Sequence, residues 1–207
     1  MLFRSLNAVS TLVLDGNAAA ATHMLAQIGD LLRTSLDNEV TPEVTLSQEM
    51  AFTEQYLAIE QTRLGARLQV GLAIPAATLD ALVPSMLLQP LVENAVRHGV
   101  APLVEGGRIA IESERHDGRL RIVIRNSGRR AAGRQEESGN GIGRAPERQE
   151  EGGNGIGLSN TAERLKTLYG TDHKFLLEWP PTGGCAVTVE LPFRTAERPR
   201  EALPCAP

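Results

Sequence analysis

Apolar residues recur at helical spacing through the first segment of the chain, residues 2–14 with the sequence LFRSLNAVSTLVL. An Asp-Gly pair at residues 15–16 interrupts the pattern, which resumes over residues 17–36. Two helices joined by a tight turn form a helical hairpin, and such a hairpin usually buries its apolar stripe against another hairpin. The pattern therefore predicts a helical hairpin at the start of the chain.

A third helix is predicted from Thr45 to Leu64. Its first residues, TLSQE, are typical of a helix start, because Ser47 is followed by Glu49 and Met50 at close to the spacing of a Ser-x-x-Glu capping box. We therefore expect Ser47 to cap this helix.

Beyond residue 64 the pattern changes to an alternation of apolar and polar positions, which is typical of strands with one buried face. Strands are predicted at residues 67–74, 108–114, 119–126, 174–180 and 185–192. Between consecutive strands, His-Asp-Gly at 116–118 and Thr-Gly-Gly at 182–184 predict tight turns.

Two more helices are predicted at residues 84–99 and 158–170, with Gly99 and Gly170 placed to stop them. The predicted fold class is therefore α+β. A helical hairpin precedes an α/β sandwich, in which a mixed sheet carries helices on one face.

The composition is that of an ordinary soluble globular protein, since 42% of the 207 residues are hydrophobic and 22% are charged. A net charge of −4 does not predict non-specific binding to nucleic acid or to an anionic membrane. Apolar runs stay shorter than the roughly 18 to 20 residues that span a bilayer, and the first residues do not predict a signal peptide. Cys185 and Cys205 form no metal or disulfide pattern, so a cytoplasmic protein is expected. The proline-rich, charged segment 194–207 is predicted to be disordered.

The helix predicted at 84–99 has two chemically different faces when about 100° is taken per residue. The buried stripe consists of Leu88, Leu91, Val92 and Ala95. Asn94, Arg97 and His98 fall on the opposite side. An amide oxygen, a guanidinium and an imidazole on one exposed face suit an anionic ligand that carries a metal ion. A solvated polar face gives the same pattern, and for this helix alone it is the better-supported interpretation.

The strand predicted at 119–126 ends in Asn-Ser-Gly, residues 126–128. A polar side chain at a strand end, followed by glycine, lets both Asn126 and the backbone at Gly128 meet the edge of a planar ligand. Taken alone, the tripeptide is more simply interpreted as a turn.

Residues 134–157 contain nearly the same sequence twice, RQEESGNGIG and RQEEGGNGIG, with Arg148 following Arg134 at an offset of 148 − 134 = 14. The second copy leads directly into the helix predicted at 158–170, so its glycines allow backbone N–H groups and the helix dipole to approach a phosphate. A dinucleotide-binding fingerprint would need glycine where the chain has Leu158, and a Walker loop would need Gly-Lys followed by Ser or Thr. The sequence meets neither requirement.

The order of these segments is more specific than any one of them: PLVENAVRHG, then NSG, then a long polar loop, then GNGIGLSNTAERL. In this order they resemble the ATP-binding domain of the GHKL superfamily, which includes gyrase, Hsp90, histidine kinases and MutL. Within it, LLQPLVENAVRHG and GNGIGLSNTAERLKTLYG look like sensor histidine kinases of the LytS/YehU type. The resemblance extends over about residues 1–192 and implies a GHKL-type α/β sandwich after the helical hairpin.

For the helix, the resemblance implies a magnesium site and a phosphate site, with Glu93 and Asn94 as catalytic residues. Asn94 matches the asparagine whose side-chain oxygen binds Mg²⁺, which bridges the ATP phosphates, and a hard cation takes oxygen ligands. Arg97 and His98 are expected near phosphate oxygens, while Glu93 has water orientation and local capping as alternative roles. Hydrolysing members carry a glutamate where this chain has Pro90, so phosphoryl transfer is expected rather than hydrolysis.

The resemblance also implies that Asn126 and Gly128 bind the adenine. Most members have aspartate at position 126, so the neutral amide should weaken binding by on the order of 1 kcal/mol, roughly fivefold in affinity. The segment from about residue 127 to residue 153 matches the family's ATP lid. The ligand-binding residues assigned to the second copy are Gly153, Gly155, Gly157 and Leu158. The first copy, followed by Pro146, is interpreted as a duplication tolerated in a surface loop; both copies alternating on the phosphates is the alternative.

At the start of the chain, MLFRSLNAVSTL resembles the family's H-F-L-F-N-S-L-N-x-I, in which the histidine accepts the phosphoryl group. Met1 stands at the first phenylalanine of that motif, so the acceptor is expected to be absent. The chain is then either a fragment cut just after the histidine or a natural product that does not phosphorylate itself. Residues 1–44 are expected to be remaining dimerisation and phosphoacceptor helices, and residues 45–193 the ATP-binding catalytic domain.

These matches imply the catalytic domain of a two-component sensor histidine kinase. It would bind ATP and Mg²⁺ and transfer the γ-phosphoryl group to a histidine, for relay to a response regulator of the LytTR type. The full-length kinase is expected to be a homodimer, either cytoplasmic or anchored to the membrane, and no nucleic acid is expected as a partner. The alternative is a pseudokinase that binds nucleotide weakly and acts as a dimerisation or partner-binding module, because Asn126 replaces aspartate and the acceptor is missing. An ATP-hydrolysing protein ranks last because of Pro90.

Overall fold

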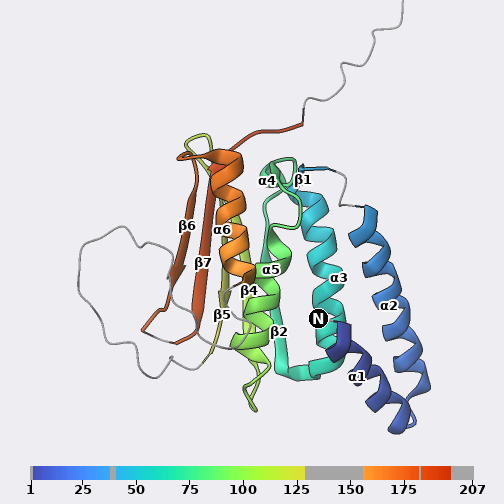
Figure 1. Ribbon diagram of the computed structural model, residues 1–207. Coiled ribbons are helices and arrows are strands. Elements are labelled where there is room, and N and C mark those ends of the chain that lie inside the picture. Colours follow the sequence, from blue (N-terminus) through green and yellow to red (C-terminus); the bar gives the residue numbers. More distant parts are fainter. Residues whose placement is uncertain (1, 38–40, 129–155, 182, 197–207) are drawn as a thin grey trace, which may run out of the picture.

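The computed structural model of the protein describes residues 2–37, 41–128, 156–181 and 183–196 (Figure 1). In chain order its helices and strands are α1 (Leu2–Leu14), α2 (Ala18–Asp37), β1 (Glu43–Thr45), α3 (Leu46–Leu64), η2 (Gly65–Arg67), β2 (Leu68–Ala73), α4 (Ala76–Leu79), β3 (Leu82–Pro84), α5 (Leu88–Asn94), η3 (Ala95–Val100), β4 (Gly107–His116), β5 (Arg119–Asn126), α6 (Ile156–Tyr169), β6 (Lys174–Glu178) and β7 (Cys185–Pro192). Of these, η2 is a 3-10 turn and η3 is a π-helical segment.

Five strands form one mixed sheet in the order β2-β4-β5-β7-β6. β2 runs parallel to β4, while the other neighbouring strands pair antiparallel. The strand latest in the described chain, β7, therefore lies between β5 and β6. A separate two-stranded ladder joins β1 to β3.

The helices cover one face of this sheet, and the core lies between the two layers (Figure 1). Alternate residues of β4 point into the core, as Ile109 and Ile111 do with no exposed surface. Glu112 and Glu114 of the same strand lie on the other face, among charged side chains. The structure thus confirms an α+β fold in which N-terminal helices precede a mixed sheet covered by helices on one face.

The turn between β4 and β5 follows from two residues. Asp117 and Gly118 have φ angles of 48° and 73°, and the strands pair up to His116 opposite Arg119. A two-residue turn with positive φ at both positions matches the twist of an antiparallel hairpin, and Asp-Gly is among the sequences that favour it. The hairpin predicted across residues 116–118 is confirmed.

The cap of α3 differs from the expected one. Thr45 precedes the helix in an extended conformation, its side chain accepts from Gln48 N at 3.3 Å, and its own N–H donates to Gln48 Oε1 at 2.9 Å. This is a complete capping box of the form Thr-x-x-Gln. Ser47 is the second residue of the helix, so its prediction as the cap is wrong. β1 ends at Thr45 and supplies the extended backbone that a cap needs.

The helix predicted at 84–99 differs at both ends. Residues 82–84 pair with β1 as strand β3, so the helix begins at Leu88. Gly99 does not stop it, because the helix continues as η3 and Ala101 N donates to Val96 O at 2.8 Å, five residues back. Gly99 is needed for a different reason, the close approach of β5 described below.

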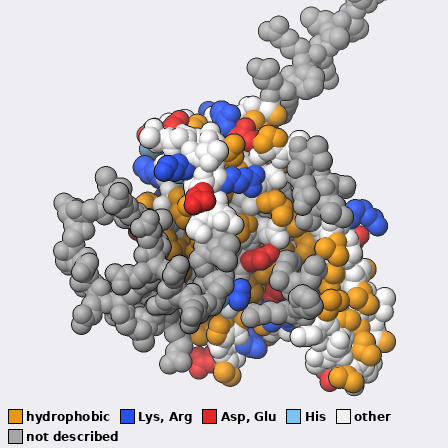
Figure 2. All heavy atoms as spheres, in the orientation of Figure 1, with side chains coloured by type: hydrophobic (Ala, Val, Ile, Leu, Met, Phe, Trp, Pro, Cys, Tyr) orange, Lys and Arg blue, Asp and Glu red, His pale blue; other side chains and the backbone are white. Residues whose placement is uncertain are grey.

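The N-terminal hairpin packs on the rest of the protein through α3. Buried side chains on α1 and α2, among them Val9 and Met24, belong to the main core cluster. The stripe expected to face a second hairpin is therefore covered in part by α3. Leu6, Val13 and Leu25 of the hairpin remain exposed, and Figure 2 shows apolar side chains gathered over this region. Among the described residues, no helix has both the length and the apolar character needed to cross a membrane.

Candidate functional site

The helix made of α5 and η3 has the two faces that its sequence predicts. Leu88, Leu91 and Val92 have no exposed surface and lie in the core. Asn94 is half-buried on the other side. Arg97 and His98, in the π-helical segment, are exposed. The polar face of this helix is therefore accessible to a ligand. π-Helical segments are frequent at functional sites.

Asn126, at the end of β5, lies directly against η3. A β-carbon placed on Gly99 would lie 2.0 Å from Asn126 Nδ2 and 2.3 Å from its Cγ. Asn126 Nδ2 donates to Ser127 O at 3.1 Å. The amide nitrogen of Asn126 therefore lies against Gly99 of η3 and donates to the backbone of Ser127.

The backbone around Asn126 is equally close to its neighbours. A β-carbon on Gly184, where φ is 82°, would lie 2.0 Å from Asn126 O. One on Gly128 would lie 3.3 Å from Gly99 O. Glycines thus surround the end of β5, and they bring it against the helix that carries Asn94.

The first turn of α6 meets the same helix. Gly157 is the second residue of α6, and a β-carbon placed on it would lie 3.8 Å from Pro90 Cβ on α5. Pro90 and Asn94 are four residues apart and share one face of a helix. The amino end of α6 therefore lies near the side of α5 that carries Asn94. Leu158 packs partly against the core, so its contribution to a ligand would be its backbone N–H. The predicted Gly153 and Gly155, and most of the predicted lid, lie outside the described residues.

A buried carboxylate holds the start of α5. Glu49 of α3 accepts from Met86 N at 2.6 Å and from Leu88 N at 2.9 Å, and it is only 4% exposed. Burial raises the pKa of this carboxyl above its ordinary value, while the N–H groups of the α5 start and the positive charge of Arg164 oppose the increase. A cation holds the other end, where Arg67 Nη2 donates to Ala101 O at 3.1 Å and to Leu103 O at 2.6 Å.

These residues fit Mg·ATP better than a metal ion alone. The described residues contain no group of three His, Cys, Asp or Glu that could hold a metal. Mg²⁺ usually keeps several waters and takes few protein oxygens beside phosphate oxygens, so the amide oxygen of Asn94 would be enough to link the protein to a bound Mg·ATP. Glu93 accepts from Gln89 Nε2 at 2.9 Å, one turn earlier on the same helix.

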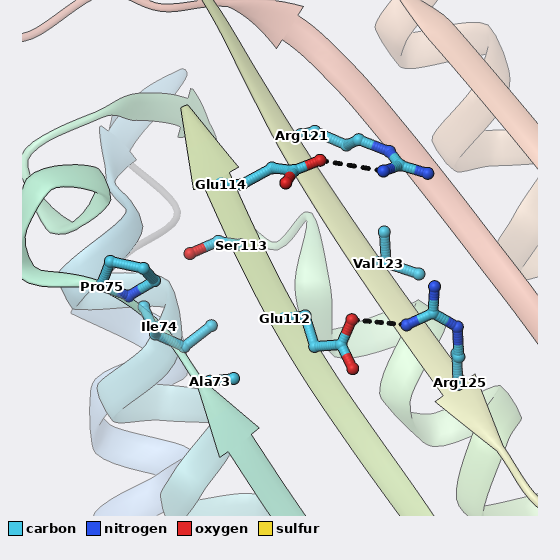
Figure 3. Close-up of a pocket in the computed structure, with 9 residues that line it drawn as sticks. All are labelled: Ala73, Ile74, Pro75, Glu112, Ser113, Glu114, Arg121, Val123 and Arg125. Carbon is cyan, nitrogen blue, oxygen red and sulfur yellow. Dashed lines mark hydrogen bonds and ion pairs between the residues drawn. The ribbon is translucent and has the colours of Figure 1, made fainter. Parts of the chain in front are cut away.

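A cavity of about 440 Å³ lies on the opposite face of the sheet (Figure 3). Ion pairs line it: Arg121 Nη1 lies 2.9 Å from Glu114 Oε1, and Arg125 pairs with Glu112 across β4 and β5. Their charges neutralise one another, and the face is open to solvent. This cavity holds none of the predicted site residues, and its paired charges match a solvated sheet face.

Glu49, Arg67 and the packing role of Gly99 were missed by the sequence analysis. Glu49 was assigned to the cap of its own helix, and Gly99 to the end of another. Their partners are long-range: Glu49 contacts residues 37 and 39 positions away. The sequence of a single chain carries no periodic signal at such a separation.

Comparisons with known proteins show the family to which the chain belongs. The profile of the family described as "Histidine kinase" matches residues 1–68, and that of "Histidine kinase-, DNA gyrase B-, and HSP90-like ATPase" matches residues 80–195. The chain is 29% identical over 193 residues to sensor histidine kinase BtsS of Escherichia coli K12, covering 93% of this chain and 31% of BtsS. It is 29% identical over 195 residues to sensor protein LytS of Enterococcus faecalis, covering 94% of this chain and 32% of LytS.

The fold is also found in a solved structure of the catalytic domain of histidine kinase ThkA. The TM-score is 0.53 at 20% identity, over 74% of this chain and 99% of that chain. This likeness supports the fold alone. The chain spans about a third of the length of the curated relatives it matches.

Proposed function

Because this chain belongs to the family of histidine kinase-, DNA gyrase B- and HSP90-like ATPases, and within it to the LytS/YehU-type sensor histidine kinases, we propose that it binds Mg·ATP and transfers the γ-phosphoryl group to a histidine. One observation carries the proposal. Two separate segments meet the helix that carries Asn94: β5 approaches it through Asn126 at Gly99, and α6 approaches it at Pro90.

The proposal gives each residue a physical task. The Asn94 oxygen is the protein ligand of Mg²⁺, and the metal neutralises charge on the phosphates. Arg97 and His98, exposed one turn further along, face the phosphate oxygens. Gly157 and Leu158 offer backbone N–H groups at the amino end of α6, where the helix dipole favours an anion.

We assign the adenine base of ATP to the other side of η3. Asn126 Oδ1 accepts from the exocyclic amine of adenine, and Gly128 leaves room for the ring. Gly153 and Gly155 are proposed to join the phosphate site from the segment before α6. Glu93 is proposed to act locally, through Gln89, rather than on the reacting atoms.

Transfer is proposed rather than hydrolysis because the position on α5 that faces α6 is Pro90. A proline side chain has no group that can take a proton from water. The acceptor is proposed to be a histidine outside this 207-residue chain, since none of the four histidines of the chain lies within the phosphoacceptor motif. We further propose a homodimeric full-length kinase and a response regulator of the LytTR type as the partner that receives the phosphoryl group.

A pseudokinase is the second candidate, favoured by the neutral amide of Asn126. A charged acceptor contributes about 1.5–3 kcal/mol and a neutral one about 0.5–1.5, so nucleotide binding would be weakened. In that case the protein would act by pairing with a partner kinase.

Calorimetry with ATP separates the two candidates. The wild-type chain should bind ATP with a magnesium-dependent affinity that Asn94→Ala removes, while Glu114→Gln on the opposite sheet face leaves binding unchanged. Mixing the chain with labelled Mg·ATP and a longer copy that carries the acceptor histidine should then label that copy. An absence of binding at millimolar ATP would support the pseudokinase and overturn the kinase proposal.

A further inference from the structure

We infer that Glu49 and Arg67 are positioning residues for Asn94, because they hold the two ends of the helix that carries it. The inference rests on the proposed function, since it concerns the side chain assigned to magnesium. Neither residue is proposed to touch the nucleotide. Both act through the backbone of the helix made of α5 and η3.

At the amino end, Glu49 occupies a site formed by backbone N–H groups. Met86 has a φ of 58°, in the left-handed region, and Leu87 follows with φ −74° and ψ −51°, in the right-handed helical region. Left-handed and right-handed conformations in succession turn neighbouring N–H groups toward one point and create an anion-binding concavity. The protein fills it with its own carboxylate, bound to the N–H groups of Met86 and Leu88.

At the carboxyl end of the same helix, Arg67 donates hydrogen bonds to backbone carbonyl groups. Its guanidinium binds the oxygens of Ala101 and Leu103, immediately after η3. A negative charge at the start of a helix and a positive charge at its end both match the helix dipole. The two contacts therefore oppose rotation and sliding of the helix between them.

Glu49 lies in the first turn of α3, and Arg67 lies at the end of η2, the 3-10 turn that follows α3. Gly65, where φ is 61°, ends α3 between them. α5 and α3 lie side by side in the helical layer (Figure 1). A slip of α5 by one residue would turn each of its side chains by about 100°, and the Asn94 oxygen would leave the site beside α6.

A purely stabilising role predicts something different from a positioning role. Loss of stability lowers the midpoint of thermal unfolding and leaves the properties of the folded site unchanged. Loss of position changes the site itself. It should affect the metal more than the adenine base, because Asn94 moves with the helix, whereas Asn126 lies on β5 and contacts the helix at Gly99. The magnesium requirement of the folded protein therefore distinguishes the two roles.

The test uses Glu49→Gln, which keeps the side-chain shape and replaces one acceptor oxygen by a donor, and Arg67→Lys, which keeps the charge and loses the planar fork. Glu54→Gln, exposed on α3, and Arg125→Lys, on the opposite sheet face, are the matched controls. ATP binding is measured by calorimetry across a magnesium titration and in EDTA. The side-chain amide signal of Asn94 is followed by NMR without nucleotide.

Both test variants should need about tenfold more Mg²⁺ for the same ATP affinity, the usual cost of losing a residue that orients a metal ligand. Their affinity in EDTA should match that of the wild type, and the Asn94 amide signal should shift in both but not in the controls. Equal losses with and without metal, or a wild-type magnesium requirement in both variants, would overturn the inference and leave the proposed function standing. No ATP binding by the wild-type chain would overturn the proposed function, and the inference with it.

Discussion

Gly99 lies so close to the side chain of Asn126 that a methyl group at position 99 would be 2.0 Å from Asn126 Nδ2. The contact joins the end of β5 to the helix that carries Asn94. It explains why glycine stands inside a π-helical segment, where it contributes nothing to helix stability. The two proposed halves of the nucleotide site, base and phosphate, are brought together at this one position.

Gly99→Ala should therefore weaken ATP binding by more than about tenfold and lower the free energy of unfolding by roughly 1–3 kcal/mol, the usual cost of overpacking. Calorimetry and urea unfolding measure the two effects. Gly29→Ala is the control, because a β-carbon at this helical position of α2 meets nothing within 4 Å; it should raise stability by about 0.5–1 kcal/mol. Wild-type affinity in Gly99→Ala would show that Asn126 is not needed for the base.

Asn126→Asp should strengthen ATP binding by roughly fivefold, because a charged acceptor replaces a neutral one of the same shape. Titration of both proteins with ATP at fixed magnesium and salt measures the difference. Asn126→Ala should lose most of the affinity. If the aspartate variant binds more weakly than the wild type, the amide is donating to the ligand instead of accepting from it.

Glu49 should make stability depend on pH in a definite direction. Its folded-state pKa is raised, so its contribution is fully present below the unfolded value of about 4.5 and is lost as the pH rises through the folded value. The stability of the wild type relative to Glu49→Gln should thus be highest near that pH and fall toward neutrality. Urea unfolding of both proteins over this range checks the sign. A difference that grows with pH would mean that the hydrogen bonds to α5 outweigh burial.

Cys185 should be a poor nucleophile, since burial raises the pKa of its thiol to about 11. Against an ordinary value of 9.0, the thiolate fraction at neutral pH is lower by roughly a hundredfold. In a Cys205→Ser background, reaction with a thiol reagent should be slow in buffer and fast in urea. Fast reaction in the folded protein would show that the β5–β7 pairing at Cys185 opens readily.

The ion pairs on the outer sheet face should matter little. Glu114 and Arg121 are about half-exposed, and such pairs contribute about 0–1 kcal/mol. Glu114→Gln and Arg121→Gln should each change the free energy of unfolding by less than about 1 kcal/mol and leave ATP binding unaltered. A large loss of ATP binding in either variant would show that the site has been assigned to the wrong face of the sheet.

The features predicted correctly from the sequence are those that depend on residues close together in the chain. The Asp117–Gly118 turn and the two faces of α5 follow from neighbours in sequence, and the structure confirms both. Gly99 was assigned to a helix end by the same kind of local rule, and that assignment is wrong because its reason for being glycine lies on β5. Glu49 was read as part of a cap for α3, yet its carboxylate serves α5.

The position of β7 has a consequence for synthesis on the ribosome. Within the described chain β6 pairs only with β7, and β7 also supplies the second neighbour of β5. Chains are made at about 5–20 residues per second from the amino end, so until residues 185–192 emerge, the nascent polypeptide exposes an unpaired edge on β5 and an unpartnered β6. The sheet is completed only after this late strand has been made, and unpaired strand edges are prone to pair with other chains during that interval.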